Sequence, residues 1–334
     1  MNMPLVSVLM PVYNAEAFVK EAIASILDQS YQNFEFIIIN DGSTDSSEGQ
    51  IISFKTDKIK YYKNETNLGL IATLNKGIDL CKGEYIVRMD ADDLSLRDRI
   101  KKQVEFMESN KGVGVCGCDY IHFGKGKQIP LKSHHTHDLI SGWMLFNSSV
   151  VHPALIIRSS VLKSEKTYFN SEFKHVEDYE LWSRLLFKSQ FADIPETLLK
   201  YRIHASQVSL KFRGEQIENG NKVRKRLLEK IGFKFSEREF RVHCLLGNSQ
   251  IISSLNDLAA LSVWFDELYD QNQKLKFIPE ATLQNILAKQ WYDACGITNL
   301  GTKAFFFYFK SHWHNNYPGS KAMLLSKCIV RWVR

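Results

Sequence analysis

The chain has 334 residues, of which 44% are hydrophobic, and a formal net charge of +6 at pH 7. This is the composition of a globular protein that is long enough for one large domain and a smaller appendage. We expect neither a membrane span, which needs roughly 18 apolar residues, nor a signal peptide, because the apolar segment Leu5 to Val12 lacks a basic leader and a small-residue cleavage site.

The six cysteines are scattered, and the Cys116/Cys118 pair has no second pair or nearby histidine pair to complete a zinc site. We interpret them as reduced, mostly buried thiols of a cytoplasmic protein.

The net charge is distributed unevenly along the chain. The last acidic residue is Asp293, and the six lysines and arginines after it account for the whole net charge.

The first 118 residues predict alternating strands and helices. Nearly continuous apolar runs predict buried strands at residues 5–10, 34–39 and 84–89, and shorter strands at 60–63 and 113–118. Helical periodicity starts at Glu16 and recurs across residues 72–80 and 96–109. This alternation is typical of a doubly wound α/β domain with a mostly parallel, Rossmann-like sheet.

The first two strands end in polar side chains, where dinucleotide-binding folds carry glycines. Tyr13 and Asn14 follow the first strand and Asp41 follows the second. No Gly-x-Gly-x-x-Gly lies between a predicted strand and a predicted helix, and no Walker sequence occurs. These residues suit a nucleotide base, with Asp41 accepting a hydrogen bond from a ring N–H and Tyr13 stacking on the ring. A turn that starts the next helix near Asp45 is the alternative interpretation of Asp41.

The stretch from Glu84 to Asp93 is the strongest candidate for chemistry. An apolar strand ends there at three carboxylates, Asp90, Asp92 and Asp93. Because strand side chains alternate in direction, Asp90 and Asp92 are expected to point the same way, toward a divalent cation and a substrate phosphate. A solvated acidic turn is the alternative.

The polar segment 127–151 contains His134, His135 and His137, but their spacing does not match a zinc-binding helix. We expect a mobile loop beside the site, followed by a strand over residues 152–158.

Glu177 and Asp178 begin a predicted helix, where acidic residues are favoured as caps by the helix dipole. The functional alternative is a general base with a low pKa.

A predicted strand at residues 197–200 leads to Arg202 and His204. Arg202 fits a phosphate clamp or a fixed surface charge, and His204 fits a structural hydrogen bond or a ligand.

In the C-terminal third, helices are predicted at 218–231, 237–246, 255–269 and 281–295. The basic, aromatic tail 303–334 fits peripheral contact with an anionic membrane, which we favour over packing on the body and over nucleic-acid binding.

Six motifs resemble those of family 2 glycosyltransferases in order and spacing over residues 5–207. The similarity is greatest to bacterial lipooligosaccharide and O-antigen enzymes, especially β-1,3-N-acetylglucosaminyltransferases, and the C-terminal third carries no such match. The motifs are Pro11-Val12-Tyr13-Asn14, Asn40-Asp41-Gly42-Ser43-Thr44-Asp45, Asn67-Leu68-Gly69, Asp90-Ala91-Asp92-Asp93, His175-Val176-Glu177-Asp178 and Tyr201-Arg202-Ile203-His204.

The resemblance implies a GT-A fold and an inverting transfer from a nucleotide sugar. It implies that Asp41 binds the uracil, that Asp92 and His204 ligate Mn²⁺ or Mg²⁺, and that Asp178 is the catalytic base. Glu177 and His152 are placed on the acceptor side. The residues expected at the nucleotide sugar are Pro11, Tyr13, Asn14, Asp41, Asn67, Asp90, Asp92 and Arg202.

The resulting hypothesis is an inverting, metal-dependent glycosyltransferase that uses UDP-GlcNAc, or next UDP-Gal, and forms a β-linkage to a saccharide or lipid-linked saccharide of a bacterial surface glycan. The alternatives are a non-catalytic nucleotide-sugar-binding protein and a nucleotidyltransferase. We expect a catalytic domain at 1–212, with a nucleotide-binding half (1–118) and an acceptor half (119–212), and a helical region at 213–334. We expect it on the inner face of the cytoplasmic membrane.

Overall fold

The computed structural model describes residues 3–124, 126–165, 168–204 and 212–332, and the chain divides into two compact units. The first unit comprises residues 1–140 and 149–216, and the second comprises residues 141–148 and 217–334. The predicted boundary at residues 212–213 therefore lies close to a division of the chain, although residues 141–148 group with the C-terminal unit. The division of residues 1–212 into two functional halves stays a prediction.

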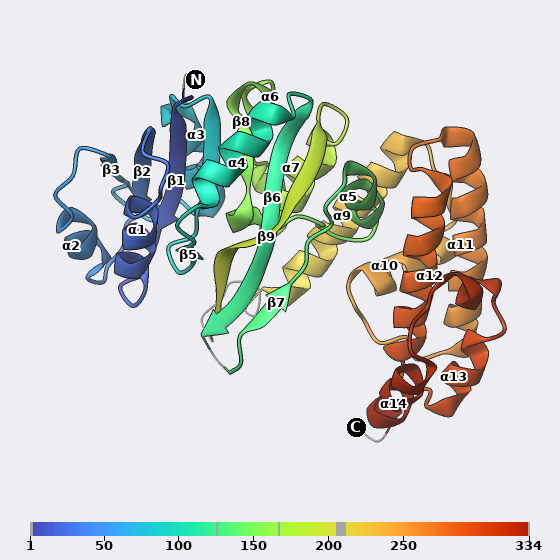
Figure 1. Ribbon diagram of the computed structural model, residues 1–334. Helices are drawn as coiled ribbons and strands as arrows, with labels where there is room; N and C mark the ends of the chain where they lie inside the picture. Colours follow the sequence, from blue (N-terminus) through green and yellow to red (C-terminus); the bar gives the residue numbers. More distant parts are fainter. Residues whose placement is uncertain (1–2, 125, 166–167, 205–211, 333–334) are drawn as a thin grey trace. The chain divides into compact units, whose positions relative to one another are not determined.

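The first unit is built on a nine-stranded sheet, among the described residues, in the order β3-β2-β1-β4-β8-β6-β9-β5, with β7 paired to β6 (Figure 1). The first four strands in this order are parallel, whereas β8 runs antiparallel to both β4 and β6. The strands are β1 (Val6–Val12), β2 (Phe34–Asn40), β3 (Ile59–Lys63), β4 (Tyr85–Arg88), β5 (Leu94–Ser95), β6 (Val113–Gly124), β7 (Ile129–Leu131), β8 (Ile156–Arg158) and β9 (Gln190–Ile203).

Helices cover the two faces of this sheet because its central strands are apolar on both sides. Val8 and Met10 of β1 pack on one face in a core that also contains Ile23 and Val104 from two helices. On the other face, a Cβ at Gly77 would overlap the side chain of Leu9, so helix and strand approach closely there. The helices are α1 (Val19–Leu27), α2 (Ser47–Ile52), α3 (Leu70–Leu80), α4 (Arg99–Ser109), α5 (His137–Met144), α6 (Ser159–Lys163) and α7 (Glu177–Leu185), with 3-10 turns η1 (His152–Ala154) and η2 (Ser171–Phe173).

Two local predictions are wrong. The expected loop at 127–151 contains β7 and α5, because Ile140 and Met144 are spaced by one helical turn and both are fully buried. The expected strand at 152–158 begins only at Ile156, because Pro153 lacks the N–H that a strand ladder needs and lies in the turn η1. The strand predicted at 197–200 is part of the longer β9.

The second unit is helical, and the four helices predicted there are present. Its core contains the buried rings of Trp264, Trp291 and Trp313. In the described part of the chain, no helix is long and apolar enough to cross a membrane. The elements are α9 (Arg213–Ile231), whose first turn belongs to the first unit, α10 (Glu237–Gly247), α11 (Leu255–Leu275), α12 (Glu280–Gly296), α13 (Thr302–Tyr308), the 3-10 turn η3 (His312–Asn316) and α14 (Lys321–Trp332).

Candidate functional site

The parallel strands β1, β2 and β4 bring their carboxyl ends to one edge of the sheet. Tyr13, Asp41 and Asp90 follow these strand ends, so residues far apart in the sequence share that edge. In a parallel sheet this edge is where ligands bind. The predicted residues Tyr13, Asp41 and Asp90 are therefore positioned by the parallel part of the sheet.

The loops after β1 and β2 are joined by hydrogen bonds through Asn14. Its backbone N–H donates to Ser43 Oγ at 3.0 Å, and its Oδ1 accepts from the Thr44 N–H at 2.9 Å. Asn14 has a φ of 46°, in the left-handed region that asparagine tolerates better than most residues. Tyr13 beside it is 48% exposed, which leaves its ring available for stacking, whereas Pro11 is buried within β1.

Asp41 holds the turn that starts α3. Its Oδ1 accepts from the Leu68 N–H at 2.9 Å and from Asn64 Nδ2 at 2.8 Å, and its Oδ2 accepts from the Gly69 N–H at 2.9 Å. Asn67 Oδ1 accepts from the same Gly69 N–H at 2.8 Å. Asp41 is 4% exposed, and an ionised carboxylate offers about four acceptor positions. A structural role of this carboxylate thus accompanies the predicted contact with a nucleotide base.

The three carboxylates after β4 converge. One ligand atom from each of Asp90, Asp92 and Asp93 lies within 4.8 Å of the others. Arg88 forms an ion pair with Asp90. Burial is the main cause that raises the pKa of Asp90. The pKa of Asp93 is raised more strongly, by burial and then by the charges of Asp90 and Asp92.

The end of β9 completes this cluster. His204 Nε2 lies 2.8 Å from Asp92 Oδ2, and the Arg202 N–H donates to Asp93 Oδ1 at 2.8 Å. Asp93 Oδ2 is buried and has no hydrogen-bond partner among the described residues. Carboxylate oxygens with one imidazole nitrogen suit Mn²⁺ or Mg²⁺, and a buried carboxylate oxygen without a hydrogen-bond partner is free to act as a cation ligand. These residues therefore fit a divalent metal.

The Arg202 side chain is engaged within the protein. Its Nε donates to the Asp92 carbonyl oxygen at 2.6 Å, and its Nη2 donates to Glu21 Oε2 at 2.7 Å. The guanidinium also lies over the rings of Phe18 and Phe123, 4.7 and 4.4 Å from their centroids. These contacts fix the backbone at Asp92, and a contact of Arg202 with the donor stays a prediction.

Glu177 and Asp178 occupy the first turn of α7, as expected, but the low pKa expected for Asp178 is wrong. Burial raises the pKa of Asp178, although the Tyr179 N–H, which donates to its Oδ1 at 2.7 Å, and the charge of Arg88 both oppose that shift. Burial, followed by the charge of Asp178, raises the pKa of Glu177 from 4.5 to about 7. Removal of water outweighs the favourable helix dipole at this position.

Arg88 is a buried cation next to the candidate site, and no role is predicted for it from the sequence. It is 4% exposed, and its charge acts on Asp90, Glu177, Asp178 and His152. Burial, followed by the charge of Arg88, holds the pKa of His152 well below its usual value. The sequence signal is an arginine within an apolar run that ends at three carboxylates, because an arginine is rarely buried without a carboxylate partner.

The His-rich segment does not join this cluster. His135 Nε2 lies 2.8 Å from Asp119 Oδ1, and His137 Nδ1 accepts from the Phe191 N–H at 3.1 Å. These bonds fasten the segment to β6 and β9.

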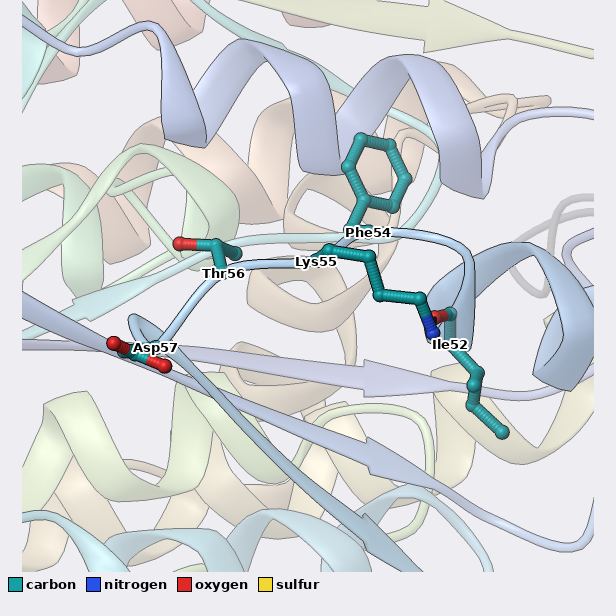
Figure 2. A pocket seen from close by; sticks show the side chains of 5 residues that line it. All are labelled: Ile52, Phe54, Lys55, Thr56 and Asp57. Carbon is teal, nitrogen blue, oxygen red and sulfur yellow. Dashed lines mark hydrogen bonds between the residues drawn. The ribbon is translucent and has the colours of Figure 1, made fainter.

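A pocket also lies at the amino ends of the parallel strands, opposite the carboxyl ends that carry the candidate site. Figure 2 shows that it is lined by Ile52, Phe54, Lys55, Thr56 and Asp57, in the turn between α2 and β3. This turn precedes β3, so it lies at the amino ends of the parallel strands. None of the predicted site residues lines it.

Sequence comparison identifies similar proteins with a common description. The sequence model of glycosyl transferase family 2 matches residues 7–170. An uncharacterized glycosyltransferase of Haemophilus influenzae is 36% identical over 248 residues, which cover 69% of this chain and 76% of that protein. The uncharacterized glycosyltransferase MJ1057 of Methanocaldococcus jannaschii is 34% identical over 212 residues, covering 61% and 72% of the two chains.

Two solved structures have a similar fold at low sequence identity. S. aureus TarS 1-349 in complex with UDP-GlcNAc has a TM-score of 0.55 at 15% identity and covers 96% of this chain and 90% of its own. The mannosyltransferase PcManGT from Pyrobaculum calidifontis, in complex with GDP-Man and Mn²⁺, has a TM-score of 0.56 at 14% identity, with coverages of 98% and 88%. The predicted GT-A fold class is confirmed, whereas a specific closeness to β-1,3-N-acetylglucosaminyltransferases is not shown.

Proposed function

Because the chain belongs to glycosyl transferase family 2, we propose that it is an inverting, metal-dependent enzyme that transfers a sugar from a UDP-sugar to a saccharide. UDP-GlcNAc is the favoured donor and UDP-Gal the next, and the acceptor is a saccharide or lipid-linked saccharide of a bacterial surface glycan. The observation that carries this proposal is the convergence of Asp90, Asp92 and Asp93 beside His204 at the carboxyl edge of the sheet.

On the donor side, the proposed contacts use the three strand ends. Tyr13 stacks on the base, and Asp41 accepts from its ring N–H while holding the turn at Gly69. Asp92 and His204 hold Mn²⁺ or Mg²⁺, which when bound supplies positive charge that stabilises the departing diphosphate. The complexes of similar folds with UDP-GlcNAc and with GDP-Man and Mn²⁺ support a nucleotide sugar and a divalent cation. The remaining proposed donor contacts are Pro11, Asn14, Asn67, Asp90 and Arg202.

On the acceptor side, Asp178 acts as the base. It takes the proton of the acceptor hydroxyl as that oxygen bonds to the anomeric carbon, and the bond from this carbon to the UDP oxygen breaks, which inverts the configuration. A raised pKa makes an ionised Asp178 a stronger base than an ordinary aspartate. His152 and Glu177 are the residues proposed to orient the acceptor.

We propose further that the second unit binds an anionic membrane through α14. Leu324 and Cys328 face the interior of the unit, whereas Met323, Ile329 and Val330 on the opposite side of the helix are 53%, 43% and 51% exposed. An exposed apolar helix face beside cations, in a segment without acidic residues, matches an anionic lipid surface. This contact puts the enzyme on the inner face of the cytoplasmic membrane.

The proposal is tested by measuring UDP release from a panel of UDP-sugars, with and without Mn²⁺, for the wild type and Asp92→Ala. We expect slow hydrolysis of one donor that requires metal and is lost in the variant. Binding of a UDP-sugar without any turnover supports the non-catalytic alternative instead. Failure of every UDP-sugar to bind in the presence of metal contradicts the UDP assignment.

A further inference from the structure

The residue three positions before the proposed base has an unusual backbone conformation. His175 has a φ of 66°, in the left-handed region that costs most non-glycine residues energy. Such residues cluster at functional sites, and among the described residues the others outside glycine are Asn14, Ser249 and Lys276. The structure therefore holds His175 in place by other contacts.

The conformation of His175 sets where α7 begins. The Val176 N–H donates to the Phe173 carbonyl oxygen at 3.1 Å, which closes a turn, and the helix starts with the next residue, Glu177. Val176, at the N-cap position, makes no side-chain cap hydrogen bond. The turn at His175, rather than a cap, thus directs the first turn of the helix that carries Asp178.

Three contacts from Phe212 and the first turn of α9 hold this turn. The ring of His175 stacks on Phe212, with centroids 4.2 Å apart and an angle of 9° between the planes. Gln216 Nε2 donates to the His175 carbonyl oxygen at 3.2 Å, and Glu215 Oε2 lies 3.4 Å from His175 Nε2. Both the ring and the backbone of His175 are therefore fixed from one short segment, residues 212–216.

We propose that His175 is a positioning residue for Asp178 and that Phe212 is the side chain that keeps it in place. This inference rests on the proposed function, in which Asp178 takes the acceptor proton. A displacement of the base by about 1 Å costs on the order of 100-fold in rate. The contacts act on one helix end and leave the donor-binding strand ends untouched.

The test compares Phe212→Ala with Phe187→Ala. Phe187 follows the other end of α7 and is 39% exposed, against 43% for Phe212, so it is a matched control. Turnover with the active donor, donor affinity and amide hydrogen exchange of residues 174–180 are measured for both variants. We expect Phe212→Ala to lower kcat on the order of 10- to 100-fold, to leave donor affinity unchanged and to speed exchange at Val176 and Glu177.

Two more variants separate positioning from general stability. Phe212→Tyr keeps an aromatic ring for the stack and is expected to restore kcat, and His175→Phe is expected to retain most of it. Unchanged hydrogen exchange in Phe212→Ala overturns the proposal that Phe212 keeps His175 in place, whatever the activity of the variant. An equal effect in Phe187→Ala, or a rise in acceptor KM with kcat preserved, also overturns it. A wild type that turns over no nucleotide sugar overturns the proposed function instead, and with it any catalytic role of the contact between His175 and Phe212.

Discussion

His204 Nε2 lies 2.8 Å from Asp92 Oδ2, although the two residues are 112 positions apart in the chain. One comes from the loop after β4 and the other from the end of β9, and these strands are not neighbours in the sheet. An imidazole paired with a carboxylate at an acidic cluster is the arrangement expected of two ligands to one cation.

Replacing His204 tests this pair. In His204→Ala, we expect the Mn²⁺ concentration for half-maximal UDP release to rise at least about tenfold, because one nitrogen ligand is lost. A suitable control is His312→Ala in the second unit, which removes a similar pair, His312 Nε2 with Asp266 Oδ1 at 2.9 Å. An unchanged Mn²⁺ requirement in His204→Ala shows that His204 is not a ligand.

Replacing the proposed base tests the chemistry. Asp178→Asn keeps the shape of the side chain but cannot take a proton, so we expect kcat to fall by roughly 10²- to 10⁴-fold while donor affinity is retained. Steady-state kinetics and equilibrium titration with the donor measure the two quantities. Asp138→Asn, in the first turn of α5, controls for the loss of an acidic residue at a helix start. Retained turnover in Asp178→Asn requires another base.

The raised pKa of Glu177 predicts a pH dependence of stability. Its pKa is about 7 in the folded protein and 4.5 in the reference state, so the folded state binds more protons between these values. Stability is therefore expected to fall as the pH rises from about 4.5 to 7, by on the order of 3 kcal/mol from this group. Glu177→Gln removes this loss, and melting temperatures at pH 5 and pH 8 should differ less than in the wild type. An identical pH dependence in both proteins contradicts the raised pKa.

The contacts of Asp41 predict a stability effect without any ligand. Asp41→Asn replaces one carboxylate oxygen by an NH₂ group, which then faces either the Gly69 N–H or the donors of Leu68 and Asn64; we expect this loss of an acceptor to cost about 1 to 3 kcal/mol. Thermal unfolding of the ligand-free protein measures this loss. Asp28→Asn, at a side chain 68% exposed, is the control. If Asp41 acted only on the nucleotide, both variants would melt like the wild type.

The exposed face of α14 predicts binding to anionic vesicles. Val330→Asp adds a negative charge to that face and removes apolar area, so sedimentation with phosphatidylglycerol vesicles should weaken on the order of tenfold. Val263→Asp on α11 is a matched control in the same unit, because Val263 is 56% exposed and Val330 is 51% exposed. Equal binding by the two variants, or no preference over phosphatidylcholine vesicles, contradicts a membrane role of this face.

Several features were predictable because they depend on neighbouring residues alone. The apolar run of β2 and the carboxylates after β4 are local patterns, and they were located correctly. The helix α5 was missed although Ile140 and Met144 carry its signal, because the polar histidines before it masked a short apolar period. The turn η1 differs from the predicted strand because Pro153 interrupts the apolar run His152 to Arg158 without an N–H for a strand ladder.

What the sequence by itself determined is the set of chemical groups at each strand end and helix start. Only the tertiary structure decided which of these groups meet: His204 with Asp92, the Arg202 guanidinium with Glu21, and Phe212 with His175. It also decided the direction of the pKa of Asp178, since the helix start alone favours a low value. The reason is that pairing and removal of water depend on residues brought together by the sheet, across separations that no local pattern in the chain records.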